Sequence, residues 1–137
     1  MVFEILGTPR GKGRPRFKRM GKFTATYTDS QTANYEDSVR WEYLAAAKGK
    51  VFDGPIQMNI VVYHEIPKSA SPTKAGRMRQ GLILPTKKPD ADNVAKIIAD
   101  ALNKVAYKDD TQIVNLSVIK SYADMPKTVV EILEIEQ

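Results

Sequence analysis

Two segments of the chain carry apolar residues at the three-to-four-residue spacing of an amphipathic helix. In the segment that follows Asp92, these positions are Val94, Ile97, Ile98, Ala101, Leu102 and Val105. In an earlier segment, which begins at Thr28, Asp29 or Ser30 and runs to about Lys48, they are Tyr35, Val39, Tyr43, Leu44 and Ala47. The pattern predicts two helices with one buried face each, and residues 71–82 form a third, short and basic helical candidate.

Strict alternation of apolar and polar residues marks residues 56–66 as a half-buried strand. One face of that strand carries Ile56, Met58, Ile60, Val62, His64 and Ile66. Further strands are predicted at residues 2–6, 111–122 and 127–135, with Val114, Leu116 and Val118 on one side of the second. Residues 7–22 form a loop rich in Gly, Pro and Arg, with a loose hairpin continuing to Tyr27. This order predicts one domain, residues 1–137, of the α/β (α+β) class, in which helices pack on a mixed sheet.

The composition excludes several classes of protein. No cysteine is present, so the chain forms neither disulfides nor thiolate metal sites. No apolar run approaches the length of a membrane span, and residues 1–6 are too short for a signal peptide. We therefore expect a cytoplasmic protein without membrane contact.

Positive charge is concentrated in two segments that contain no acidic residue. Residues 10–22 hold seven Lys and Arg, residues 66–88 hold six, and the rest of the chain has 8 basic and 16 acidic residues. Such segregation is typical of a surface that binds a polyanion, above all nucleic acid, although solvated basic loops remain an alternative. The candidate DNA contacts are Arg10, Lys12, Arg14, Arg16, Lys18, Arg19, Arg77, Arg79, Lys87 and Lys88.

Acidic residues gather where the stronger helix begins. Asp90 and Asp92 stand at its entry, and Lys96 lies one turn beyond Asp92. Asn93, Lys96 and Asp100 share its polar face. Asp110 starts the following strand and returns toward the helix only if the sheet packs beside it.

Three carboxylates and an amide would form an oxygen-rich site that suits Mg²⁺, with Mn²⁺ as a possible substitute. Such an ion activates water and stabilises a departing oxygen in phosphoryl chemistry, with Lys96 nearby to support the developing charge. Helix capping is the competing interpretation, and it accounts for one Asp better than for two. An EF-hand is excluded, because Ala95 and Ala101 stand where it needs Gly and Glu.

A family pattern joins these features. Asp90-x-Asp92-Asn93-x-x-Lys96, an apolar helix, and then Asp109-Asp110-x-Gln112-Ile113-Val114 resemble the motif of the RusA Holliday junction resolvases. The loop Gly11-Lys12-Gly13-Arg14-Pro15-Arg16 and Tyr27-Thr28 look like the branch of that family found in phages and Gram-positive bacteria. The resemblance extends over nearly the whole chain, and it departs at Lys87-Lys88-Pro89, where some members carry an arginine run.

The resemblance implies an α/β homodimer that uses Mg²⁺ and resolves four-way DNA junctions by paired nicks in recombination and repair. It also implies roles for individual residues. Asp90, Asp92 and Asp110 match the metal-binding acids, Lys96 the catalytic lysine, and Asn93 and Lys120 supporting positions.

The sequence leaves other functions open. A non-catalytic module could clamp branched or duplex DNA with its basic loops, and an enzyme acting on a small phosphorylated substrate is a weaker third candidate. His64 is expected to be a partly buried structural residue rather than a metal ligand, and Trp41 to pack in the core or at a dimer interface. Phe17, Phe23 and Tyr27 fit base stacking and hairpin packing equally well.

Overall fold

The structure, a computed structural model, describes residues 1–13, 16–20, 23–27 and 30–137; for residues 16–20 and 23–27 the backbone alone is described. A four-stranded sheet forms its centre, in the order β1 (Val2–Leu6), β6 (Lys127–Glu134), β4 (Ile56–Glu65), β5 (Ile113–Ala123). Strands β4 and β5 are parallel, whereas β6 runs antiparallel to both β1 and β4. The predicted α+β domain with a mixed sheet is therefore confirmed.

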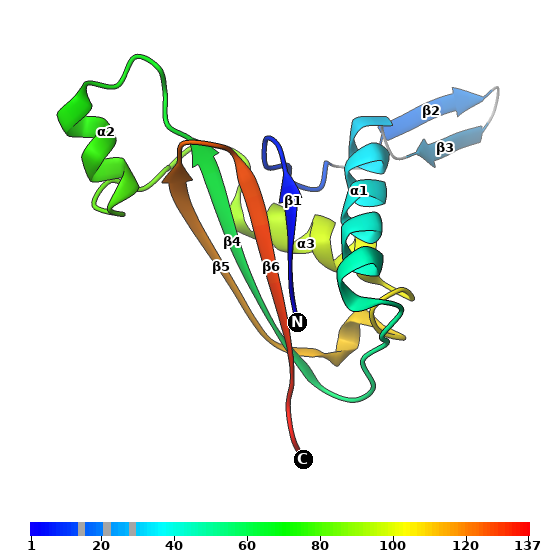
Figure 1. The fold of residues 1–137 in the computed structure, drawn as a ribbon. Helices are drawn as coiled ribbons and strands as arrows, with labels where there is room; N and C mark the ends of the chain where they lie inside the picture. The colour runs from blue at the N-terminus through cyan, green and yellow to red at the C-terminus, as the bar shows by residue number, and fades with distance from the viewer. Residues whose placement is uncertain (14–15, 21–22, 28–29) are drawn as a thin grey trace.

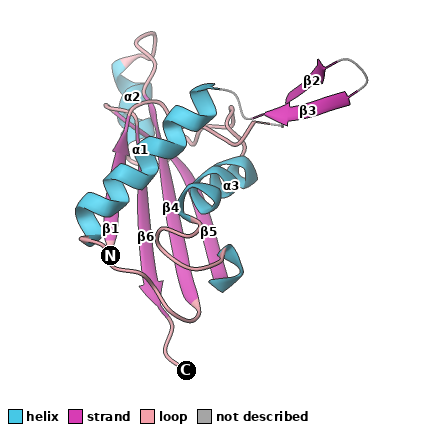
Figure 2. Cartoon of the chain, turned by 90° about the vertical axis from the view of Figure 1, so that its right-hand side faces the viewer, coloured by secondary structure: helices cyan, strands magenta, loops and turns pink. Residues whose placement is uncertain are grey.

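Two helices cover one face of this sheet, as Figures 1 and 2 show. They are α1 (Ser30–Ala47) and α3 (Ala91–Leu102), which also contact each other. The shorter α2 (Pro72–Arg79) lies near the end of β4 and β5 and contacts β5. A hairpin of β2 (Arg16–Met20) and β3 (Phe23–Tyr27) projects from the body and confirms the predicted loose hairpin. No helix of the described residues is long and apolar enough to cross a membrane.

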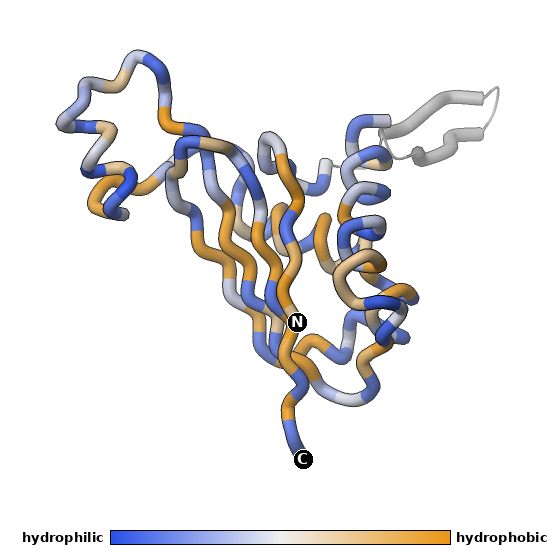
Figure 3. Tube along the Cα trace, in the orientation of Figure 1, coloured by the Kyte–Doolittle hydropathy of each residue, from blue (hydrophilic) through white to orange (hydrophobic). Residues whose placement is uncertain are grey.

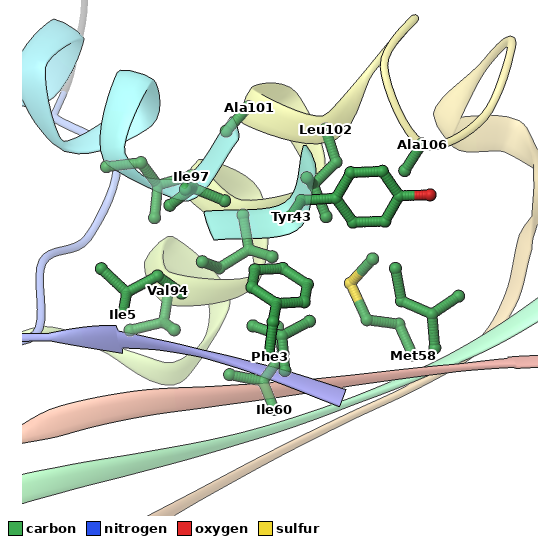
Figure 4. Close-up of a cluster of buried hydrophobic side chains, with 14 of the residues drawn as sticks. Phe3, Ile5, Tyr43, Met58, Ile60, Val94, Ile97, Ala101, Leu102 and Ala106 are labelled. Atoms are coloured by element: carbon green, nitrogen blue, oxygen red, sulfur yellow. The ribbon is translucent and has the colours of Figure 1, made fainter. Parts of the chain in front are cut away.

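The core lies between the sheet and the two covering helices. Alternate residues of β4 face it, and the trace in Figure 3 shows the same alternation of hydrophobic and hydrophilic positions. Figure 4 shows how side chains from β1, α1, β4 and α3 meet, with the rings of Phe3 and Tyr43 in edge contact at a centroid distance of 5.7 Å. Burial of this much apolar surface is the main stabilising contribution to such a fold. Fully buried members include Val39, Tyr43, Met58, Ile60, Ile97, Ile98 and Leu102.

Three details of the predicted pattern are wrong. Leu44 is 40% exposed, because it lies beside the buried stripe of α1 rather than on it. Helix α3 ends at Leu102, so Val105 lies in the following turn, which continues into the buried Ala106 and Tyr107. Strand β5 shifts register against β4 at its start and lies at the edge of the sheet, which leaves Val114 and Leu116 exposed. The predicted caps Thr28 and Asp29 lie outside the described residues, and Ser30 is the first residue of α1.

Candidate active site

Asp90 and Asp92 stand where α3 begins. Asp90 has the extended backbone of an N-cap residue, yet its side chain makes no capping hydrogen bond. Asp92 lies in the first turn, and both side chains are exposed. The helix dipole favours both negative charges. Among the described residues, the Asp90 side chain accepts no capping hydrogen bond from the helix. Both carboxylates therefore remain available to a ligand.

The N-terminal loop packs against this end of α3. The backbone N–H of Lys12 donates to the carbonyl oxygen of Asn93 at 2.9 Å. Gly11 lies so close that a Cβ atom there would be 2.8 Å from the Cβ of Asn93 and 3.0 Å from that of Pro89. Only a glycine lets the loop approach the helix this closely.

The loop and the helix enclose a pocket of about 810 Å³. Basic residues of the loop and both acids face the same space, so positive and negative groups surround one opening. The residues that line it are Pro9, Arg10, Gly11, Lys12, Gly13, Lys88, Pro89, Asp90, Asp92 and Asn93.

Lys12 is held by two acids rather than left to the solvent. Its Nζ lies 2.8 Å from Oε1 of Glu36 on α1 and 3.4 Å from Oδ2 of Asp100 on α3. Burial lowers the pKa of Lys12, but hydrogen bonding and charge from Glu36, followed by Asp100, raise it above its ordinary value overall. This ammonium group ties the loop to both helices, and much of its charge is neutralised inside the protein.

The predicted catalytic lysine lies on the same face of α3. Nζ of Lys96 is 3.4 Å from Oδ2 of Asp100, which Lys12 also contacts. Lys96 remains largely exposed, so its ammonium group can move toward a ligand. Asp100 thus links the predicted catalytic lysine to the basic loop.

Asp110 begins the short 3-10 turn Asp110–Gln112 that precedes β5. A hydrogen bond with Asp109, then burial, then the charges of Asp109 and Asp100 raise the pKa of Asp110, and Lys96 acts in the opposite direction. The charges that act on Asp110 therefore include Asp100 and Lys96 on the polar face of α3, and its role as a metal ligand stays a prediction. Its neighbour Asp109 caps the turn by accepting from the N–H of Thr111, so Asp109 has a structural task.

The three predicted metal ligands are not gathered in one place. Asp90 and Asp92 line the pocket, whereas Asp110 is absent from its lining. Within the described part of the chain, no three His, Cys, Asp or Glu side chains form a group that could hold a metal ion. Two carboxylates and the Asn93 side chain do offer the hard oxygen donors that Mg²⁺ takes, and Mg²⁺ needs few protein ligands because it keeps several waters.

The predicted DNA contacts other than Lys12 fall into three groups. Arg77, Lys87 and Lys88 are exposed. Arg10 donates to Gln31 at 2.6 Å, and Arg79 pairs with Asp124 at 2.9 Å. Arg14 lies outside the described residues, and of Arg16, Lys18 and Arg19 only the backbone of β2 is described, as for Phe17, Phe23 and Tyr27 in the same hairpin.

Lys120 contacts the loop that precedes α3. It lies on β5, and its Nζ donates to the carbonyl oxygen of Lys87. This contact joins β5 to the loop whose next two residues, Lys88 and the cis-bonded Pro89, line the pocket beside Asp90. The supporting role of Lys120 stays a prediction.

Sequence reasoning gave no role to Glu36 or to the carboxylate of Asp100. Glu36 is buried on α1 between the apolar positions Tyr35 and Val39. An acid on the apolar face of a predicted helix signals a buried partner, because an unpaired buried charge is costly. Glu36 carries this signal in the sequence. Its partner is Lys12, which the charge pattern predicts as a DNA contact.

Two comparisons with known proteins bear on this arrangement. The family model of RusA endodeoxyribonucleases matches residues 7–133. The chain is also 37% identical over 139 residues to an uncharacterized protein, YqaN, of Bacillus subtilis strain 168, covering 97% of this chain and 95% of that one. The match includes the basic loop, both acids of α3, Lys96 and Asp110, and so this chain belongs to the RusA endodeoxyribonuclease family.

Proposed function

We propose that this protein is a Mg²⁺-dependent endonuclease that resolves four-way DNA junctions by paired symmetric nicks, in recombination and repair. The observation that carries the proposal is the first pocket, where Asp90 and Asp92 face a basic loop across a space of about 810 Å³. Carboxylates beside a polyanion site repel the substrate unless a cation lies between them. Membership in a family of endodeoxyribonucleases supports the same chemistry.

Asp90 and Asp92 would hold the magnesium ion, with the Asn93 side chain beside them and Asp110 as a third ligand. The ion would supply an activated water and neutralise charge on the phosphate. The role of the chain would be to position these carboxylates, which lie at the start of α3. Contacts to Asn93, Glu36 and Asp100 hold the loop over them.

Lys96 would stabilise the charge that develops on the phosphoryl oxygens during cleavage. It has the reach for this task, since its only ion pair among the described residues is the 3.4 Å contact to Asp100 on an exposed face. Its substitution by Ala should slow cleavage while metal binding and DNA binding persist.

The decisive experiment is a cleavage assay on a labelled four-way junction and a matched linear duplex, with Mg²⁺ or with chelator. Only the junction with Mg²⁺ should be cut, at symmetric positions. Asp90→Asn, Asp92→Asn and Asp110→Asn should each abolish cleavage and preserve junction binding, because each removes charge from a metal site that also repels phosphate. The matched control is Asp53→Asn, an exposed acid in a different loop, which should cut at the wild-type rate.

A second function has one observation in its favour. Because the described residues contain no group of three metal-binding side chains, a DNA-binding module without catalysis is the competing candidate. Such a module would bind the junction equally well with Mg²⁺ or chelator and would leave every strand intact. Cleavage by the wild type that Asp110→Asn fails to reduce would remove Asp110 from the site without removing the activity.

A further inference from the structure

A second pocket, of about 380 Å³, adjoins the first. It lies where β4 ends, and it is lined by Thr8, Pro9, residues 64–68, Lys87 and Pro126. Pro9 lines both pockets, and the neighbours Lys87 and Lys88 line one each. The two pockets are therefore adjacent parts of one surface that leads from the start of α3 past the end of β4.

The second pocket is predominantly basic. Lys68 and Lys87 line it, and Glu65 is the one acid among its lining residues. Lys120 adds a third positive charge close to the pocket, because its Nζ donates to the carbonyl oxygen of Lys87. A site with this balance attracts an anion, and its single carboxylate provides no metal site.

His64 gives this pocket a polar group that the fold does not use. It faces inward from β4 in line with Met58 and Val62, and it is 5% exposed. Its Nε2 is buried and has no hydrogen-bond partner among the described residues. A buried polar atom left unpaired costs about 1–3 kcal/mol, and an apolar residue at this position would avoid that cost.

The surroundings of His64 disfavour the charged form of its ring. Burial, followed by the charges of Lys87 and Lys120, lowers its pKa below the ordinary value. The ring of Tyr122 lies at a centroid distance of 6.4 Å, and the charged residues Glu65 and Lys68 line the same pocket. An anion between these lysines would offset their positive charge and thereby raise the pKa of His64.

We propose that the second pocket binds a backbone phosphate of the DNA arm that leads away from the first pocket, and that His64 takes up a proton from solvent when this phosphate binds. The proposal rests on the proposed function, because it takes DNA as the ligand. The phosphate would be held by Lys68 and Lys87. The positive charge of the protonated His64 ring would add to the attraction. Junction binding then becomes tighter as pH falls, from above the pKa of His64 in the complex to below its pKa in the free protein.

His64 is the only histidine of the chain, so its ring gives a single, unambiguous set of NMR signals. The experiment titrates these signals from about pH 5 to pH 8 in chelator, for the free protein, for the protein with inorganic phosphate and for its complex with a four-way junction. We expect the junction to raise the pKa of His64 by about one unit, which corresponds to roughly tenfold tighter binding at the acidic end. Inorganic phosphate at the same phosphate concentration should produce a much smaller rise.

Variants separate His64 from the rest of the surface. His64→Gln keeps a polar side chain that cannot be protonated, so junction binding measured by fluorescence anisotropy should lose the tenfold pH dependence. Lys87→Gln removes one charge beside the ring, and it should raise the pKa of free His64 and reduce the further rise on binding. Lys50→Gln is the matched control, since Lys50 pairs with Glu134 at 3.4 Å outside both pockets and should change neither quantity.

The possible failures are distinguishable. If the wild type binds the junction but the His64 signals titrate unchanged, the second pocket is not a phosphate site, and the proposed nuclease function stands. If inorganic phosphate raises the pKa as much as the junction does, the pocket holds a free anion and the DNA assignment is overturned. If no junction binds under any condition, the proposed function itself fails, and this inference fails with it.

Discussion

Lys12, which the charge pattern predicts as a DNA contact, forms ion pairs within the protein. It connects the basic loop to Glu36 and Asp100, and the Lys12 and Glu36 side chains are 18% and 10% exposed. Lys12→Met should therefore destabilise the protein by about 1–3 kcal/mol, because it leaves a buried carboxylate without its partner. Urea unfolding measures this loss. The double variant Lys12→Met, Glu36→Gln should lose less than the sum of the single variants, and strict additivity would mean that the pair is not coupled.

The same pair gives a pH dependence with a defined sign. The folded protein raises the pKa of Lys12 above its ordinary 10.5. The stabilisation is therefore fully present below pH 10.5 and is lost as pH rises through the higher folded-state pKa. The stability difference between the wild type and Lys12→Met should accordingly be constant at neutral pH and shrink in strongly alkaline solution.

Gly11 sets the distance between the loop and α3. Because a Cβ atom there would lie 2.8 Å from the Cβ of Asn93, Gly11→Ala should force the loop away from the helix. We expect a stability loss of about 1–3 kcal/mol, typical of overpacking, and a fall in cleavage larger than the fall in junction binding. Gly76→Ala is the control, since that position has open space around it. Equal behaviour of both variants would show that the close approach is unimportant.

At the scale of elements, the sequence predicted β4 and α3 best, because each has one fully covered face and a clear period. The pattern failed at β5, where a register shift against β4 and an edge position expose apolar residues that look like core. It also missed the buried Glu36, because periodicity weighs an acid as a surface residue regardless of its partner. The pattern correctly predicts Asp90 and Asp92 at the start of α3. The distance of Asp110 from these two acids depends on how the sheet packs beside the helix, which no local pattern encodes.

The contrast between β4 and β5 is testable with one substitution at two positions. Val62 on β4 is fully buried, whereas Val114 on β5 is 61% exposed. Val62→Thr should cost about 1–3 kcal/mol, because it buries a hydroxyl group in an apolar site. Val114→Thr should stay within about 0.5 kcal/mol of the wild type. Urea unfolding of both variants decides the point, and equal losses would contradict the edge position of β5.

The whole molecule combines a net charge of +5 with a local excess of positive charge around the two pockets. Binding that depends on phosphate contacts releases counterions, so junction affinity should fall steeply with salt. We expect a loss of at least tenfold between about 50 and 200 mM salt. Anisotropy titrations in chelator measure it without cleavage. A flat salt response would exclude a phosphate-dominated interface.

A homodimer is the expected assembly, because a four-way junction has two-fold symmetry and each chain supplies the pocket that holds Asp90 and Asp92. Light scattering at micromolar concentration should give twice the 15.3 kDa chain mass. Trp41 does not belong to the core, since it is 72% exposed on α1, and this leaves the dimer interface as its remaining predicted use. Trp41→Ala should then weaken the dimer, while an unchanged mass would place the interface elsewhere. A protein that stays monomeric even on the junction would favour a simpler branch nuclease.

The sheet joins the two ends of the chain, and this has a consequence for synthesis. Strand β1 is synthesised before the other described strands and pairs with β6, which is synthesised after them, and the backbone N–H of Ile132 donates to the carbonyl oxygen of Met1. β6 also lies between β1 and β4, so the sheet stays divided until residues near 134 have emerged. Domains fold as units during translation, and pairing over so long a separation is slow. The sheet therefore cannot close, and the loop after β1 cannot pack on a finished core, until β6 has left the ribosome.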